Sequence, residues 1–130
     1  MMESSIFEIV KKEKKNITYI NLQTINKLFC KYFFKYIVDI KNKIILEVGP
    51  GTGNLTSFIL KQKPKKIFVI EKDDNLAKNL NENFGEQLTI INDDILNIDE
   101  NSLFDQKVIV FGNLPYNIST EILSKWIINL

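Results

Sequence analysis

The sequence predicts an α/β fold built on a mostly parallel sheet with helices on both faces. Four short runs rich in isoleucine, valine, leucine and phenylalanine are each bounded by turn residues, as in buried parallel strands. Segments with apolar residues three or four positions apart alternate with these runs, which is typical of amphipathic helices. The chain has 130 residues, of which 45% are hydrophobic and 25% are charged. This is the length and the composition of about one globular domain.

Residues 1–21 are expected to form a basic N-terminal arm, with the folded domain over residues 22–130. Residues 1–16 are polar and rich in lysine, and we expect them to be mobile. Apolar residues at helical spacing then predict a helix from Leu22 to Ile37. Cys30 lies within this apolar pattern, so we expect its thiol to be buried and inert.

Four strands and three further helices are predicted after residue 43. The strands are expected over residues 44–48, 66–71, 88–92 and 107–111. The helices are expected from Leu55 to before Pro64, from an N-cap at Asp74 to Gly85, and from Ile118 to Ile127. Strands that alternate with helices in this way indicate a parallel sheet.

The charge pattern and the missing residue types exclude several classes of function. The chain has no histidine, which excludes histidine metal sites and histidine acid–base catalysis, and we expect no metal. One cysteine cannot form an internal disulfide, which fits a reducing cytoplasm, and no apolar run is long enough to cross a membrane. Residues 1–43 hold nine lysines and four acids, whereas residues 44–130 hold eight lysines and twelve acids. A polyanion would therefore meet the N-terminal part first.

A glycine-rich loop follows the first predicted strand. Gly49, Gly51 and Gly53 allow a tight turn and a close approach of the backbone to a ligand, and Glu47 precedes them. The dinucleotide fingerprint fails, because its sixth position is Asn54. The loop therefore suits a nucleoside with a cationic group better than a pyrophosphate. The alternative is a tight turn without a ligand.

Acidic residues follow the second and third predicted strands. Glu71 lies eighteen residues after Gly53, close to the spacing of about 20 at which a carboxylate holds a ribose. Asp93 and Asp94 follow the third strand, where a carboxylate can accept a hydrogen bond from an adenine amino group. Their spacing does not decide which of the two has this role. The alternative is that these acids are solvated turn residues.

The fourth predicted strand is followed by Asn113, Leu114, Pro115 and Tyr116. The Asn113 side chain can orient an amine, and Pro115 makes the turn rigid and aims the Leu114 carbonyl outward. Tyr116 offers a ring on which a base can stack. This set suits the methylation of an amino group on a planar substrate. A proline turn with a core tyrosine is the alternative, but four such sites at successive strand ends argue against it.

The sequence resembles the ribosomal RNA adenine N6,N6-dimethyltransferases of the KsgA type, which are related to the Erm resistance methylases. The matching blocks are residues 46–56 (LEVGPGTGNLT), 69–73 (VIEKD), 94–96 (DIL) and 112–120 (GNLPYNIST). The resemblance covers residues 43–125, and the last block is specific to this family. It implies a Rossmann-like methyltransferase fold, here truncated after the fourth strand and its helix.

The resemblance implies S-adenosyl-L-methionine as cofactor and two adjacent adenosines near the 3′ end of small-subunit rRNA as substrate. The cofactor-binding residues that it implies are Asn16, Glu47, Gly49, Gly51, Gly53, Glu71, Asp94, Ile95 and Asn113. Gly49 and its neighbours would lie beneath the methionine part, Glu71 would hold the ribose, and Asp94 would hold the adenine. Asn113 and the Leu114 carbonyl would hold the target amine, with Tyr116 stacked on a flipped base.

Two departures from the family accompany the resemblance. The N-terminal segment that contacts the cofactor in the family matches only at Asn16. The strands after the fourth and the helical RNA-binding domain are expected to be absent, which would leave the fourth strand as an exposed edge through which copies could associate. The rival interpretations are a methyltransferase acting on another amine, and a non-catalytic or degenerate RNA-binding protein that helps ribosome assembly.

Overall fold

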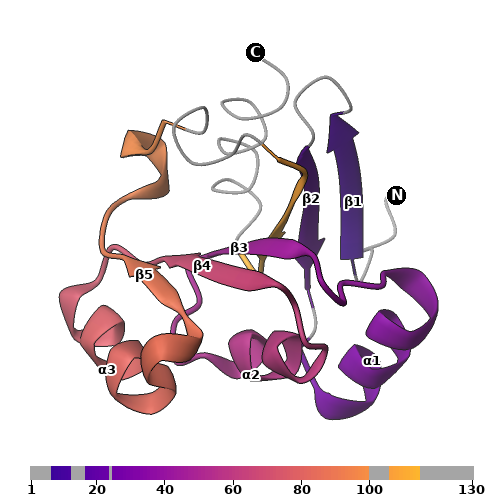
Figure 1. The fold of residues 1–130 in the computed structure, drawn as a ribbon, viewed down its shortest axis with the longest axis horizontal. Coiled ribbons are helices and arrows are strands. Elements are labelled where there is room, and N and C mark those ends of the chain that lie inside the picture. The colour runs from indigo at the N-terminus through magenta and orange to yellow at the C-terminus, as the bar shows by residue number, and fades with distance from the viewer. Residues whose placement is uncertain (1–6, 13–16, 24, 100–105, 115–130) are drawn as a thin grey trace, which may run out of the picture.

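The computed structural model describes residues 7–12, 17–23, 25–99 and 106–114, and Figure 1 shows how their elements are arranged. The six strands are β1 (Phe7–Lys12), β2 (Ile17–Leu22), β3 (Ile44–Val48), β4 (Lys66–Ile70), β5 (Thr89–Ile91) and β6 (Val108–Gly112). The helices are α1 (Lys27–Tyr32), which continues into a π-helical turn at Phe33–Ile37, α2 (Asn54–Lys61) and α3 (Asp74–Phe84). Short 3₁₀ turns lie at Gly85–Gln87 and Ile95–Asn97.

The strands form one sheet in the order β1-β2-β6-β3-β4-β5. Only β1 and β2 pair antiparallel, and the other four pairings are parallel. The register aligns the carboxyl ends of the parallel strands, since Val48 pairs with both Ile70 and Gly112, and Gly112 also pairs with Asn21. The loops that leave these strands therefore start from a single edge of the sheet, where ligands bind in open α/β folds.

Helices α1, α2 and α3 lie on one face of the sheet (Figure 1). The core on this face joins the sheet to α1 and α2, and its buried members are Ile20, Leu22, Cys30, Phe33, Phe34, Ile40, Ile45, Leu55, Ile59, Ile67, Val69, Leu88 and Phe111. A second apolar cluster, which includes Leu46, Val48 and Val110, lies on the opposite face. Cys30 is 1% exposed, which confirms the prediction of a buried thiol. The predicted parallel α/β sheet is confirmed, but the described helices α1, α2 and α3 cover one face rather than both. The predicted last helix (118–127) lies outside the described residues.

The prediction of a basic arm over residues 1–21, mobile over residues 1–16, is wrong for residues 7–12 and 17–21, which form β1 and most of β2. The many lysines in this region made it look like a solvated arm. Ile17, Tyr19 and Ile20 are nevertheless buried in the two apolar clusters, as expected of a strand. Strand β1 then pairs with β2 along all six of its residues. The N-terminal segment is therefore part of the sheet.

The predicted exposed edge on the fourth parallel strand is also wrong. Strand β6 pairs with β3 on one side and with β2 on the other, so its backbone hydrogen-bonding groups are used in the sheet. Within the described ranges, the edges of the sheet are β1 and β5. Strand β6 therefore offers no free edge through which copies of the chain could associate.

Helices α1 and α3 begin at other residues than predicted, because other side chains cap them. Leu22 is the last residue of β2, and α1 begins at Lys27 because the Asn26 side chain accepts a hydrogen bond from the Phe29 amide at 2.8 Å. Helix α3 is capped by Asp73 rather than by Asp74, since Asp73 accepts from the Leu76 amide at 3.0 Å. Adjacent polar residues make such one-residue choices hard to predict from sequence.

Candidate functional site

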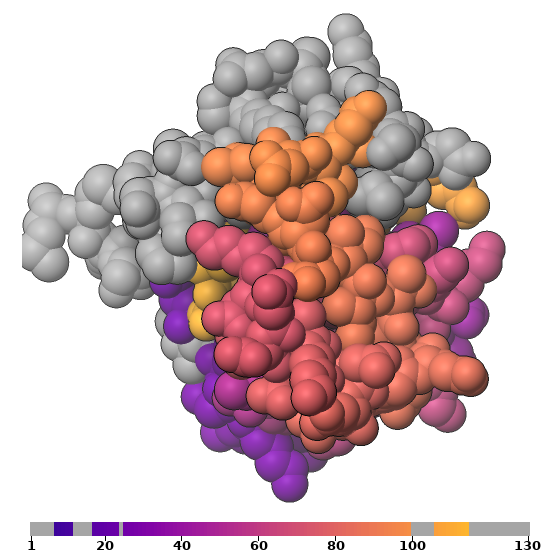
Figure 2. All heavy atoms as spheres, turned by 90° about the vertical axis from the view of Figure 1, so that its left-hand side faces the viewer, coloured from indigo at the N-terminus to yellow at the C-terminus, as the bar shows by residue number. Residues whose placement is uncertain are grey.

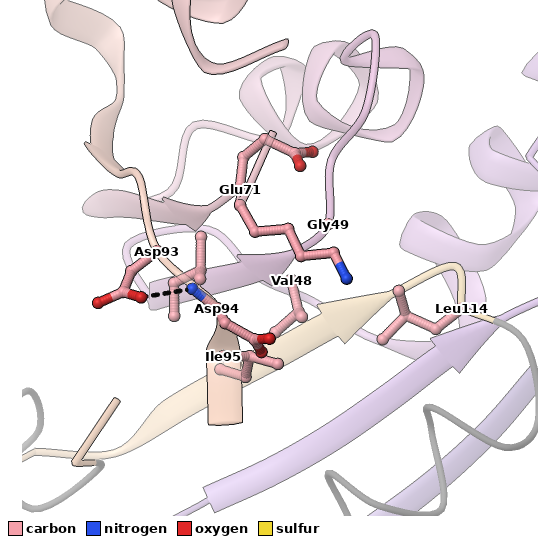
Figure 3. Close-up of a pocket in the computed structure, with 9 residues that line it drawn as sticks. Val48, Gly49, Glu71, Asp93, Asp94, Ile95 and Leu114 are labelled. Carbon is pink, nitrogen blue, oxygen red and sulfur yellow. Dashed lines mark hydrogen bonds between the residues drawn. The ribbon is translucent and has the colours of Figure 1, made fainter. Parts of the chain in front are cut away.

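A pocket of about 110 Å³ opens at the carboxyl edge of the sheet, and Figure 3 shows the residues around it. It is lined by Val48, Gly49, Ile70, Glu71, Lys72, Asp93, Asp94, Ile95 and Leu114. These residues follow or end strands β3, β4, β5 and β6, as the aligned strand ends require. The structure thus brings at least one residue of each predicted motif to this pocket, namely Gly49, Glu71, Asp94 and Leu114.

The glycine loop turns sharply away from the end of β3. Gly49, Gly51 and Gly53 all have positive φ angles, of 63°, 60° and 91°. A side chain at Gly53 would also meet Phe84, because a Cβ atom there would lie 2.6 Å from the ring. The Gly49 amide donates to the Ile70 carbonyl at 2.8 Å, which ties the loop to the end of β4. The positive φ angles therefore favour glycine at all three positions, and Gly53 needs it for space as well.

Glu71 is 6% exposed, and its carboxylate is fixed by the backbone. The Gly51 amide donates to Oε1 and the Asp73 amide donates to Oε2, both at 3.1 Å. A carboxylate oxygen has two lone pairs, so each oxygen keeps one for a further donor. The backbone of Glu71 is held as well, because its carbonyl accepts from the Asn92 side chain at 2.9 Å. The arrangement presents two aligned acceptors, which matches two neighbouring hydroxyl groups.

Asp93 and Asp94 both line the pocket but differ in their hydrogen bonds. Asp93 Oδ1 accepts from the Asp94 amide at 2.7 Å and from the Asn97 side chain at 3.2 Å, which fixes the loop. Asp94 Oδ1 accepts from the Leu96 amide at 2.9 Å and thereby caps the 3₁₀ turn. In Figure 3 the two carboxylates point in opposite directions, and that of Asp94 points toward Val48 and Leu114. The geometry therefore favours Asp94 for contact with a ligand in the pocket.

Glu47 lies beneath the glycine loop rather than in the lining of the pocket. It is 2% exposed, and the Thr56 hydroxyl donates to its Oε1. Burial raises the pKa of Glu47 to about 7, the Thr56 hydrogen bond lowers it, and the charge of Glu71 raises it. The Glu47 carboxyl, which lies beneath the loop, therefore gains or loses its proton near neutral pH. Thr56 has a structural role here that its position inside a predicted helix did not indicate.

Asn113 and Leu114 are held by the end of strand β2. The Asn113 side-chain nitrogen donates to the Leu22 carbonyl, and the Leu114 amide donates to Asn21 Oδ1 at 3.2 Å. The nitrogen of the Asn113 amide is therefore turned toward the end of β2. Pro115, Tyr116 and Asn16 lie outside the described residues.

Asn21 is the site residue that sequence reasoning missed. It is 3% exposed and lies near the end of β2, a strand that was not predicted from the lysine-rich N-terminal sequence. A buried asparagine within an otherwise apolar run was the available signal, because buried polar groups need a partner. Its partner is the Leu114 amide, ninety-three residues away in the chain.

Replacement of Asn21 by alanine is expected to lower the free energy of unfolding by about 1–2 kcal/mol, because the Leu114 amide loses its acceptor. Urea denaturation measures the stability, and hydrogen exchange at Leu114 measures the local effect. Asn79→Ala, at an exposed position of α3, is the matched control. Unchanged exchange at Leu114 would contradict the assigned contact.

Within the described ranges, no helix is both long and apolar enough to span a membrane. The same ranges contain no group of three or more histidine, cysteine or acidic side chains arranged to hold a metal ion.

Comparison with known proteins identifies the family. The sequence model of the ribosomal RNA adenine dimethylase family matches residues 9–129. The Ribosomal RNA small subunit methyltransferase A of Pelagibacter ubique is 65% identical over 94 residues, which cover 72% of this chain and 36% of that protein. The protein of the same name from Ehrlichia canis is 39% identical over 95 residues, which cover 71% of this chain and 36% of that protein. The chain thus spans about a third of the length of these relatives.

Solved structures agree with the fold. A dimethyladenosine transferase from Plasmodium falciparum superposes with a TM-score of 0.61 at 27% identity, covering 77% of this chain and 36% of that one. The 23S rRNA methyltransferase ErmE superposes with a TM-score of 0.59 at 24% identity, covering 80% of this chain and 41% of that one. Because the family model matches residues 9–129, the chain belongs to the ribosomal RNA adenine dimethylase family.

Proposed function

We propose that this chain binds S-adenosyl-L-methionine and transfers methyl groups to N6 of adjacent adenosines near the 3′ end of small-subunit rRNA, in cytoplasmic ribosome biogenesis. One observation carries the proposal. The aligned strand ends bring Glu71, Asp94 and Leu114 around one pocket, and Leu22 and Asn21 hold the Asn113–Leu114 segment beside it. The family supports the substrate class, and no feature of the described residues favours a different amine.

The pocket fits the nucleoside part of the cofactor. Glu71 offers two fixed acceptors for the ribose hydroxyls, and Asp94 offers an acceptor for the adenine amino group. Val48, Ile70 and Ile95 supply apolar walls for a flat ring. Gly49, Gly51 and Gly53 expose backbone at the place where the methionine part would lie. When bound, the cofactor supplies an electrophilic methyl group on its sulfonium.

The target adenine is proposed to meet the Asn113–Leu114 segment. The Asn113 side-chain oxygen and the Leu114 carbonyl would accept the two N–H bonds of the amine, which directs its lone pair out of the ring plane. The amine nitrogen would then bond to the methyl carbon as the carbon–sulfur bond breaks, which leaves a neutral thioether, and the methylated nitrogen would afterwards release its proton to solvent. Positioning supplies most of the rate, and no general base is required for this attack. Pro115 is proposed to fix the turn, and Tyr116 to stack on the base.

Replacement of Glu71 by alanine is expected to weaken cofactor binding by roughly 1.5–3 kcal/mol, the scale of a lost charged hydrogen bond. Isothermal titration calorimetry of S-adenosylmethionine with the purified chain measures this. Glu82→Ala removes an exposed carboxylate from α3 and is the matched control. Equal affinity of the Glu71 variant and the native chain would count against the ribose contact. No binding by the folded native chain would count against the cofactor proposal itself.

A further inference from the structure

The outward surface of α1 and of the π-helical turn that follows it carries exposed tyrosines beside exposed lysines. Leu28, Tyr32 and Tyr36 are 79%, 54% and 64% exposed, and their spacing of four residues places them on one side of the helix. The rings of Tyr32 and Tyr36 lie 5.2 Å apart, and Lys35 lies 5.2 Å from the centre of the Tyr36 ring. We name the lysine–tyrosine face by its six residues, Lys27, Leu28, Lys31, Tyr32, Lys35 and Tyr36.

The charge around this face is strongly positive. Residues 25–70 contain nine lysines, all exposed, and their only exposed acid is Asp39. Two basic loops lie beyond α1, one before β3 and one before β4. They are joined to each other, because the Asn42 amide donates to the Lys63 carbonyl at 3.1 Å and the Lys65 amide donates to the Lys43 carbonyl at 2.8 Å. A band of positive charge therefore runs from α1 to the amino ends of β3 and β4.

The opposite end of the helical layer is acidic. Residues 71–99 hold two lysines and eight acids. In Figure 1, α3 lies at the far end of the layer from α1, with α2 between them. Figure 2 views the molecule from the α3 side, where α3 and the chain that follows it, coloured pink to orange, form most of the coloured surface. A polyanion is therefore directed to the α1 side by the charge of the fold.

The lysine–tyrosine face also begins near the proposed target site. Strand β2 ends at Leu22, whose carbonyl accepts from Asn113, and α1 begins at Lys27. A strand of nucleic acid with one base at Asn113 can therefore continue along α1.

We propose that the lysine–tyrosine face binds a single-stranded segment of the RNA substrate. This inference rests on the proposed function for the identity of the nucleic acid. Lysines meet phosphates as point charges, and exposed tyrosine rings are platforms on which bases stack, as in other proteins that bind single strands. A second copy of the chain is a poorer occupant, because it would bring two rows of lysines together.

The test is fluorescence anisotropy of the 130-residue chain with a fluorescein-labelled single-stranded RNA of twelve nucleotides. Tyr32→Leu and Tyr36→Leu keep apolar area but remove the ring, and each is expected to raise the Kd by about 5- to 150-fold. Tyr32→Phe and Tyr36→Phe keep the ring and are expected to bind like the native chain. An apolar protein contact would tolerate leucine, so this pair separates base stacking from apolar docking.

The lysines are tested through the salt dependence of RNA binding. Lys27→Gln, Lys31→Gln and Lys35→Gln together are expected to reduce the slope of log K against log salt by about 2, because a single strand contributes about 0.7 for each phosphate contact. Lys78→Gln, on α3, is the matched control and is expected to leave the affinity unchanged.

The results separate this inference from the proposed function. Native RNA affinity in the leucine variants, an unchanged slope in the glutamine variant, or no RNA binding by a chain that binds S-adenosylmethionine would overturn the RNA-binding face. Sedimentation showing a dimer that a Tyr32→Glu variant dissociates would overturn it in favour of a self-interface. RNA binding with the expected losses, but no S-adenosylmethionine binding, would support the face and contradict the cofactor proposal.

Discussion

Replacement of Asn113 by alanine is expected to reduce methyl transfer to adenosine by roughly 100-fold or more. The variant loses the amide oxygen that is proposed to accept from the target amine. It also loses the side-chain hydrogen bond to the Leu22 carbonyl that orients the segment. Misplacement of a reacting group by about 1 Å costs about 100-fold in rate. Because Asn113 does not line the described pocket, cofactor binding is expected to survive in part.

The rate is measured as transfer of labelled methyl groups from S-adenosylmethionine to small-subunit particles that lack the modification. Asn79→Ala removes an exposed amide from α3 and is expected to methylate at the native rate. Calorimetry with the cofactor reports whether the Asn113 variant keeps its pocket. Native methylation by the Asn113 variant would contradict the role assigned to this side chain.

Glu47 alone is expected to lower the free energy of unfolding by about 3 kcal/mol as the pH rises from about 4.5 to about 7. An ordinary glutamate has a pKa near 4.5, whereas burial raises the pKa of Glu47 to about 7. Between these values the folded state keeps a proton that the unfolded state has released, so raising the pH favours unfolding. Below about pH 4.5 both states hold the proton, and this contribution to stability is fully present.

The Glu47→Gln variant isolates this contribution. Glutamine resembles the protonated carboxyl and does not titrate, so the fall in stability between pH 4.5 and pH 7 is expected to shrink by about the same 3 kcal/mol. Urea denaturation across this range measures the effect, and Glu82→Gln at an exposed site is the matched control. A Glu47→Gln variant whose stability follows the native pH dependence would contradict the raised pKa of Glu47.

The parallel sheet and the place of the pocket could be predicted because their causes are local in the sequence. The apolar run from Ile44 to Val48 and the glycines after it define a strand and the turn that leaves it. Parallel pairing then carries Glu71, Asp94 and Leu114 to the same edge without further information. Spacing did not decide between Asp93 and Asp94, and the resemblance implied Asp94. The structure adds that Asp93 Oδ1 accepts two hydrogen bonds from the loop, whereas Asp94 Oδ1 accepts one.

The N-terminal strands could not be predicted because their partners are distant in the chain. Strand β2 pairs with β6, about ninety residues later, and its lysine-rich surroundings resemble an arm. The role of Asn21 follows from that pairing, which sets the Leu114 amide beside its side chain. The cofactor role of Glu47 stays a prediction, and the structure adds that its side chain lies under the loop in contact with Thr56. Whether a polar side chain faces a ligand or supports a loop is decided by packing, which the motif does not encode.

The most direct test of the account is methyl transfer by the 130-residue chain itself. The chain is incubated with labelled S-adenosylmethionine and small-subunit particles that lack the modification, and the RNA is digested and analysed by mass spectrometry. The account predicts label in N6,N6-dimethyladenosine from adjacent adenosines near the 3′ end, and its loss in the Asn113→Ala variant. Cofactor binding by a folded chain without label in any adenosine would contradict the proposed activity.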